Sequence, residues 1–216
     1  MREFVVVTGM ILKAEPVGEY DRRVVILTDE RGKISAFAKG ARRQTSRLMA
    51  ATNPFSFGTF KLYEGRNSYN IMEANIQNYF EELRADYEGA YYGMYFLEIA
   101  DYYTRENNDE LMMLKLLYQS LRALIHKKFP NPLVKCVYEL KAIAVNGEFP
   151  GAPVDGGYQE STIYAVDYIG NTAVEKLYTF MVTESVLKEL QEIAAHYCRR
   201  FMDRKFKSLE ILETLC

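Results

Sequence analysis

Short stretches of alternating apolar and polar residues fill the first third of the chain, and this pattern is typical of β-strands. Five stretches rich in Val, Ile, Phe, Tyr and Thr cover residues 4–13, 23–28, 33–39, 55–63 and 70–76. Gly, Pro, Asp and Asn separate them, as expected for turns. The third stretch alternates most regularly, which predicts a half-buried strand. Four of its residues share one face: Lys33, Ser35, Phe37 and Lys39. The pattern leaves open whether Phe37 is a core residue or an exposed stacking platform.

A helix-compatible stretch, residues 46–52, lies between the third and fourth predicted strands. Five strands with one helix in this place are the layout of an OB-fold barrel. Such barrels commonly present a strand face and two loops to oligonucleotides. Small SH3-like barrels have a similar strand pattern, so the layout favours the OB fold without excluding them.

From about residue 79 the apolar residues recur every three or four positions, which predicts helices. The chain is therefore expected to be an α+β protein, with an OB-fold domain at 1–78 and a mostly helical domain at 79–216. Residues 163–168, followed by Gly170, favour a small hairpin in a loop or hairpin insertion near 147–172. Thr183 is expected to cap a helix that runs to residue 201, and a short helix is expected over 208–215.

The charge is unevenly distributed along the 216 residues. The whole chain has 27 basic and 29 acidic residues, a net charge of -2, which taken alone disfavours a nucleic-acid partner. Residues 1–80, however, hold 12 basic and 8 acidic residues, whereas residues 81–216 hold 15 and 21. The predicted barrel is therefore basic and the helical domain acidic.

The barrel's positive charge is concentrated in one stretch that contains no acidic residue. Its six cations are Arg31, Lys33, Lys39, Arg42, Arg43 and Arg47. Cations along a groove bind phosphate backbones, and aromatic rings stack on the bases of single strands. The candidate stacking residues are Phe37, Tyr63 and Tyr69. A solvated surface loop remains the alternative for the basic stretch. Two further basic clusters, residues 126–128 and 199–207, are interpreted as the charge preference of helix C-termini.

Enzyme and metal signatures are missing from the sequence. Cys136, Cys198 and Cys216 lie far apart, which predicts reduced thiols and neither a disulfide framework nor a zinc site. No P-loop or metalloprotease motif occurs. A nuclease that binds Mg²⁺ through carboxylates is the enzymatic alternative, with candidates at residues 81–82, 109–110 and 184–192. The sequence predicts a non-enzymatic protein without a cofactor or metal. No apolar run is long enough to cross a membrane, and we expect a cytoplasmic protein.

Several segments resemble the bacterial RecO family of recombination mediators. The resemblance is carried by residues 18–28, 30–33, 38–43 and 46–47, continues at 54–55, 63–65 and 73–74, and returns at 204–212. It implies an N-terminal OB fold followed by a helical domain. It places the DNA-binding residues at Lys39, Arg42, Arg43 and Arg47, with Arg31 and Lys33 nearby.

The resemblance also implies partners. Members of the family bind single- and double-stranded DNA, anneal complementary strands and associate with RecR. They contact the acidic C-terminal tail of single-strand-binding protein. In the RecFOR pathway they help RecA replace that protein on gapped DNA, which implies association with the nucleoid. The tail ends in an aromatic residue, so it requires a cation beside an apolar groove. In this chain the candidates are Arg122, Lys127 and Lys128.

The sequence departs from the family pattern at one place. Many relatives carry four cysteines as a zinc module in the helical domain, whereas residues 151–157 here contain no cysteine. A metal-free hairpin held by packing is therefore expected. A second interpretation of the whole chain also stays open, namely a protein-interaction adaptor whose contact with DNA is incidental.

Overall fold

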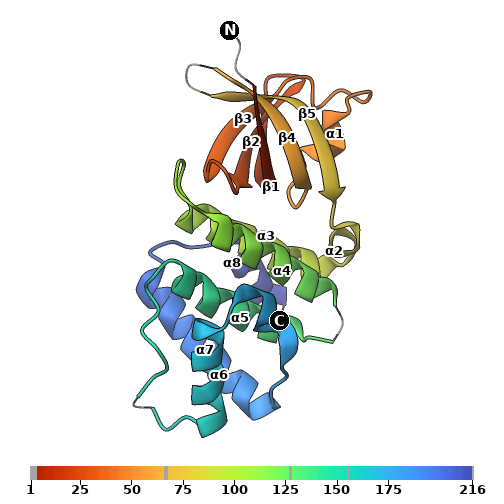
Figure 1. The fold of residues 1–216 in the computed structure, drawn as a ribbon. Coiled ribbons are helices and arrows are strands. Elements are labelled where there is room, and N and C mark those ends of the chain that lie inside the picture. Colours follow the sequence, from red (N-terminus) through yellow and green to blue (C-terminus); the bar gives the residue numbers. More distant parts are fainter. Residues whose placement is uncertain (1–3, 66–67, 127, 155, 216) are drawn as a thin grey trace. The chain divides into compact units, whose positions relative to one another are not determined.

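The computed structural model describes the chain except residues 1–3, 66–67, 127, 155 and 216 (Figure 1). The strands are β1 (Phe4–Val17), β2 (Asp21–Thr28), β3 (Lys33–Ala38), β4 (Phe57–Glu64) and β5 (Tyr69–Asn78), with a short helix, α1 (Leu48–Ala51), between β3 and β4. The remaining helices are α2 (Glu81–Ala85), α3 (Tyr87–Tyr103), α4 (Leu111–Ile125), α5 (Asn131–Val145), α6 (Glu160–Asn171), the 3₁₀ helix η1 (Val174–Thr179), α7 (Glu184–Phe201) and α8 (Lys207–Leu215). The predicted α+β class is confirmed.

The five strands close into a barrel in the order β1-β2-β3-β5-β4. β1 is long enough to pair antiparallel with β4 through its first half and with β2 through its second half. β3 and β5 pair in parallel and close the barrel. This arrangement, with α1 between β3 and β4, is consistent with the predicted OB fold.

Contacts within the chain define two compact units. The barrel unit comprises residues 1–81 and 100–114, and the helical unit comprises residues 82–99 and 115–216. The sequence pattern gave no sign that residues 100–114 associate with the barrel. They do so through the β2–β3 turn, where the Lys33 amide donates to the Arg105 carbonyl and the Asn107 amide donates to the Arg31 carbonyl.

Gly32 makes this association possible. It adopts a left-handed backbone (φ 64°), and a Cβ atom added to it would lie 2.3 Å from the Arg105 carbonyl oxygen. We expect Gly32→Ala to lower the unfolding free energy by about 2 kcal/mol or more, because it combines backbone strain with a backbone clash. Urea denaturation of the full chain measures the loss. Gly18→Ala is the matched control, because Gly18 also has positive φ (56°) but open space around its Cβ position. Equal losses in the two variants would contradict the clash.

The helical unit is built around α5, which packs against α6 and α7. Its residue Tyr138 is fully buried, stacks on Phe96 with ring centroids 4.2 Å apart and donates a hydrogen bond to the Phe96 carbonyl. The predicted cap of α7 is present, since Thr183 Oγ1 accepts a hydrogen bond from the Val186 amide.

The hairpin predicted at 163–168 is wrong, because these residues lie within helix α6. β-branched and aromatic side chains in this stretch imitate a strand. The buried residues nevertheless follow helical spacing: Thr162, Ala165, Val166 and Ile169. Lys141 also stabilises the end of the helix, since its ammonium group donates to the carbonyls of Gly170 and Thr172. A cation at carbonyls that lack intrahelical partners favours a helix over a hairpin.

Candidate nucleic-acid interface

The outer face of β2 and β3 carries an aromatic ring beside a cation. Ile34, Ala36 and Ala38 point into the barrel core, so the alternate residues of β3 point outward. Phe37 is therefore a half-buried residue of the outer face and not a core residue. Arg23 of β2 lies opposite it in the ladder, and the Arg23 Nε donates a 2.9 Å hydrogen bond to Ser35 Oγ. This surface offers a ring for stacking and a guanidinium for a phosphate.

The basic loop, residues 39–47, is fastened to the β1–β2 turn, residues 18–20. Arg42 donates through its guanidinium to the carbonyls of Gly18 and Glu19, at 3.0 and 3.1 Å, and through its amide to Tyr20. The Asp21 carboxylate accepts a 2.7 Å hydrogen bond from the Gly40 amide. These bonds join two loops that lie far apart in sequence into one surface at the end of the barrel.

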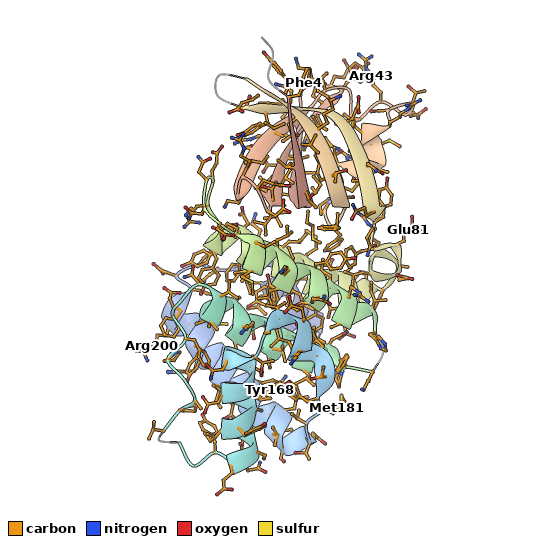
Figure 2. All side chains as sticks on the ribbon, viewed as in Figure 1. Phe4, Arg43, Glu81, Tyr168, Met181 and Arg200 are labelled. Carbon is orange, nitrogen blue, oxygen red and sulfur yellow. The ribbon has the colours of Figure 1, made fainter. Side chains whose placement is uncertain are left out.

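Arg43 and Tyr20 form an exposed pair on this surface. The guanidinium carbon of Arg43 lies 4.9 Å from the centre of the Tyr20 ring, and Tyr20 is 44% exposed. Figure 2 shows Arg43 at one end of the barrel. Arg–aromatic stacking of this kind leaves the other guanidinium face and its N–H groups available to a base or a phosphate. Lys39 and Arg47 are also exposed, one at each end of the basic loop.

Arg22 has a structural role below this loop. Its guanidinium donates to the Met49 carbonyl, Thr52 Oγ1 and Asn53 Oδ1 and thereby holds α1 against the barrel. Burial, and then the charge of Arg42, lower the pKa of Arg22. An arginine keeps its charge despite such a shift, because its ordinary pKa lies far above neutral pH. Arg22 is therefore, after Arg42, a second cation that is held in place by hydrogen bonds next to the basic loop.

The six predicted cations do not form one cluster. Lys39, Arg42, Arg43 and Arg47 lie on the basic loop, which follows β3, whereas Arg31 and Lys33 lie at the other end of this strand. The Lys33 ammonium contacts Asp101 Oδ1 at 2.9 Å and is only 21% exposed. The Arg31 guanidinium lies 3.8 Å from Glu64. Carboxylates distant in sequence thus compensate the two cations that the local sequence left uncompensated.

The candidate stacking residues also differ in where the structure places them. Tyr69 is buried in the barrel core, so its predicted role as an exposed stacking residue is wrong. Tyr63 lies on the outer face of β4, where its ring is 6.1 Å from that of Phe4. Tyr20, which sequence reasoning missed, lies at the loop instead. The available signal in the sequence was an aromatic residue in a Gly-containing turn, two residues before Arg22.

The helical unit contains a small hollow of about 200 Å³ near the predicted partner-binding residues. Its lining includes Arg122, His126, Phe129, Tyr178 and one carboxylate, Glu175. Lys128 is not among its lining residues, although its ammonium lies 5.6 Å from the centre of the Phe129 ring. Lys127 lies outside the described residues. The hollow combines an aromatic wall with a guanidinium, which is the combination that a tail with acidic and aromatic residues requires.

A larger groove of about 670 Å³ lies elsewhere in this unit, between α6, residues 180–183 and the start of α7. Tyr164, Tyr168, Phe180 and Met181 make it largely apolar, and Glu160 is its charged residue. Tyr168 and Met181 are labelled in Figure 2. The hollow also has one carboxylate, Glu175, but there Arg122 supplies a cation, whereas no Lys or Arg among the described residues lines the groove. The groove therefore suits an acidic tail less well than the hollow does.

Two of the carboxylates considered for the nuclease alternative form ion pairs or hydrogen bonds that stabilise helices. Glu184 pairs with Lys188 at 2.9 Å on α7. Glu189 accepts hydrogen bonds from Thr162 and Gln159, which lower the pKa of its carboxyl group. Among the described residues, no three His, Cys, Asp or Glu side chains gather at metal-binding distance. In the same parts of the chain, no helix is both long and apolar enough for a membrane span.

Comparison with known proteins gives a consistent result over most of the chain. The family model described as "Recombination protein O N terminal" matches residues 1–80, and that described as "Recombination protein O C terminal" matches residues 84–152. The DNA repair protein RecO of Acetivibrio thermocellus is 27% identical over 241 residues, covering 96% of each chain. That of Clostridium perfringens strain 13 is 26% identical, covering 95% of this chain and 96% of its own. The barrel, the helical unit and these matches together show that the chain belongs to the Recombination protein O family of DNA repair and recombination proteins.

Proposed function

We propose that this protein binds single-stranded DNA on the barrel, anneals complementary strands and helps RecA load on gapped DNA coated by single-strand-binding protein. The observation that carries the proposal is the basic loop fastened to the β1–β2 turn, with Arg43 on Tyr20. Phe37 and Arg23 continue this surface along β2 and β3. Phosphates would lie along the loop and bases would stack on the rings. Double-stranded DNA would use the phosphate contacts alone.

Annealing follows from charge neutralisation. Two complementary strands repel each other through their phosphates, and cations that replace condensed counterions reduce this repulsion. The protein's part is to bind and orient the strands, and no bond is made or broken. We therefore propose a mediator without catalytic chemistry, acting in the cytoplasm on nucleoid DNA.

RecR and the tail of single-strand-binding protein are the proposed protein partners. For the tail, the hollow at Arg122 is the proposed site because it places a cation beside Phe129 and Tyr178. We expect Arg122→Gln to weaken binding of a synthetic tail peptide by about 10-fold or more, as expected when a charge-assisted hydrogen bond is removed. Fluorescence anisotropy measures the change. Lys188→Gln, an exposed cation on α7, is the control, and equal weakening in both variants would argue against this hollow.

The decisive experiment is strand annealing on coated DNA. Complementary oligonucleotides covered with single-strand-binding protein are mixed with and without the chain, and duplex formation is followed by fluorescence transfer. A clear acceleration supports the mediator function. No acceleration, together with tight binding of the tail peptide, would favour the alternative of an adaptor whose contact with DNA is incidental.

A further inference from the structure

A second basic surface lies at the C-terminal end of α7. Residues 199–207 contain five basic residues and one acidic residue, although the helical part of the sequence is acidic as a whole. Its members are Arg199, Arg200, Arg204, Lys205 and Lys207, and all of them are exposed. We call these five residues the α7–α8 cluster. Five of the nine residues 199–207 are basic, against four of the nine residues of the basic loop of the barrel.

The helix C-terminus explains only part of this charge. A helix dipole favours cations in the last turn, and its effect falls off beyond that turn. Arg199 and Arg200 lie in the last turn of α7, whereas Arg204 and Lys205 lie in the following loop and Lys207 begins α8. Cations at the start of a helix are disfavoured by the same dipole. The stability of the helices therefore does not account for the cluster.

The backbone that carries the cluster is fixed by buried neighbours. Met202 and Phe206 are each 5% exposed, and the Phe206 ring packs edge-on against Tyr95 at 5.5 Å. Ser208 donates from its hydroxyl and its amide to the Glu98 carboxylate, at 2.9 and 3.4 Å. The three loop residues between Met202 and Phe206, residues 203–205, are consequently held outward. A preorganised set of cations loses less conformational entropy when it binds a ligand than a flexible tail would.

The cluster is also little neutralised from within. In the parts of the chain that the structure describes, no carboxylate forms an ion pair with Arg199, Arg200, Lys205 or Lys207. The Arg200 guanidinium lies over the Phe201 ring at 5.1 Å, which orients it without neutralising it, and Figure 2 shows Arg200 on the outside of α7. This differs from Arg31 and Lys33 of the barrel, which are both paired. Exposed cations spaced along a fixed backbone are suited to a chain of phosphates.

We infer that the α7–α8 cluster is a second phosphate-backbone site, which holds a second nucleic-acid strand while the barrel holds the first. The inference rests on the proposed function, because a second strand site serves a purpose only if the protein anneals two strands. It adds that the helical unit binds nucleic acid itself and is more than a platform for protein partners. Its contacts are to phosphates, so it should not distinguish between base sequences.

The test measures how many short oligonucleotides one chain binds. At low salt, native mass spectrometry with a dodecathymidine probe should give two oligonucleotides per chain. The variant Arg199→Gln, Arg200→Gln, Lys205→Gln should bind one, and it should anneal strands about 10-fold more slowly. The control variant Lys115→Gln, Lys176→Gln, Lys188→Gln removes three exposed cations from the same unit and should still bind two.

The outcomes separate this inference from the proposed function. If the cluster variant still binds two oligonucleotides, the inference is overturned while the barrel site stands. If variants of the basic loop also leave binding unchanged, the proposed function fails as well. If the cluster variant loses binding of a hexaglutamate peptide but keeps two oligonucleotides, the cluster serves an acidic protein partner and the inference is wrong. Circular dichroism of each variant excludes misfolding as the cause of a loss.

Discussion

Replacing Lys39, Arg43 and Arg47 together by Gln is expected to weaken binding of single-stranded DNA by about 100-fold at 0.1 M salt. Each phosphate contact on a single strand contributes about 0.7 to the slope of log affinity against log salt, so losing three flattens this slope by about 2. Arg42 is left in place because it fastens the loop through Gly18 and Glu19. A salt titration by fluorescence anisotropy measures affinity and slope together.

The control for this prediction removes the same charge from the same unit. Lys13, Arg31 and Lys61 each lie within 4 Å of a carboxylate, namely Glu15, Glu64 and Glu73. Replacing these three by Gln should change affinity by less than about 10-fold and leave the slope nearly unchanged, since a paired cation has little left to give to a phosphate. If both triple variants weaken binding equally, the protein responds to net charge and the basic loop is not the site.

The second large effect concerns the buried ion pair of α5. Glu139 is 1% exposed, and its Oε1 accepts hydrogen bonds from the Lys135 ammonium at 2.9 Å and from the Tyr95 hydroxyl at 2.7 Å. We expect Lys135→Met to lower the unfolding free energy by about 3–5 kcal/mol, because it leaves a buried carboxylate without its cation. Thermal unfolding followed by circular dichroism should show a melting temperature lower by roughly 10 °C.

Two further variants give this prediction its controls. Lys188→Met breaks a pair of the same spacing and the same 2.9 Å distance on α7, but both partners there are mostly exposed, so the cost should stay below about 1 kcal/mol. The double variant Lys135→Met, Glu139→Leu should recover most of the lost stability, since apolar replacements of a buried pair are often neutral. A single variant as stable as the original chain would show that the pair does not support α5.

The pair should also be insensitive to pH near neutrality. Burial by itself lowers the pKa of Lys135, but the charge of Glu139 and its hydrogen bond raise it above the ordinary lysine value. A cation whose pKa is higher in the folded state stabilises the fold below its unfolded pKa, which is about 10.4 for lysine. This stabilisation is lost only as the pH rises through the raised, folded-state value. The stability that the charge of Lys135 contributes to the original chain should therefore stay constant from pH 6 to pH 9, as urea denaturation across this range would show.

Local sequence determined most of the secondary structure of this protein. The period-two alternation of residues 33–39 specified a strand and its faces, because side chains of a strand point to opposite sides. The same periodicity could not decide between the inside and the outside for Phe37. Only closure of the barrel, which places Ile34, Ala36 and Ala38 in the core, made Phe37 a surface residue. At residues 163–168 the local preference for a strand was overruled by packing on α5 and by Lys141 at the helix end.

The candidate site shows the same division between local and tertiary information. The sequence alone identified the basic stretch, because a run of cations without an acidic residue is a local property. The tertiary structure decided which of these cations are available for a ligand. Asp101 lies 68 residues away from Lys33 in sequence, yet its carboxylate pairs with this lysine, whereas Arg43 remains exposed on Tyr20. Charge pairing depends on distance in space, and a sequence read position by position contains no such distances.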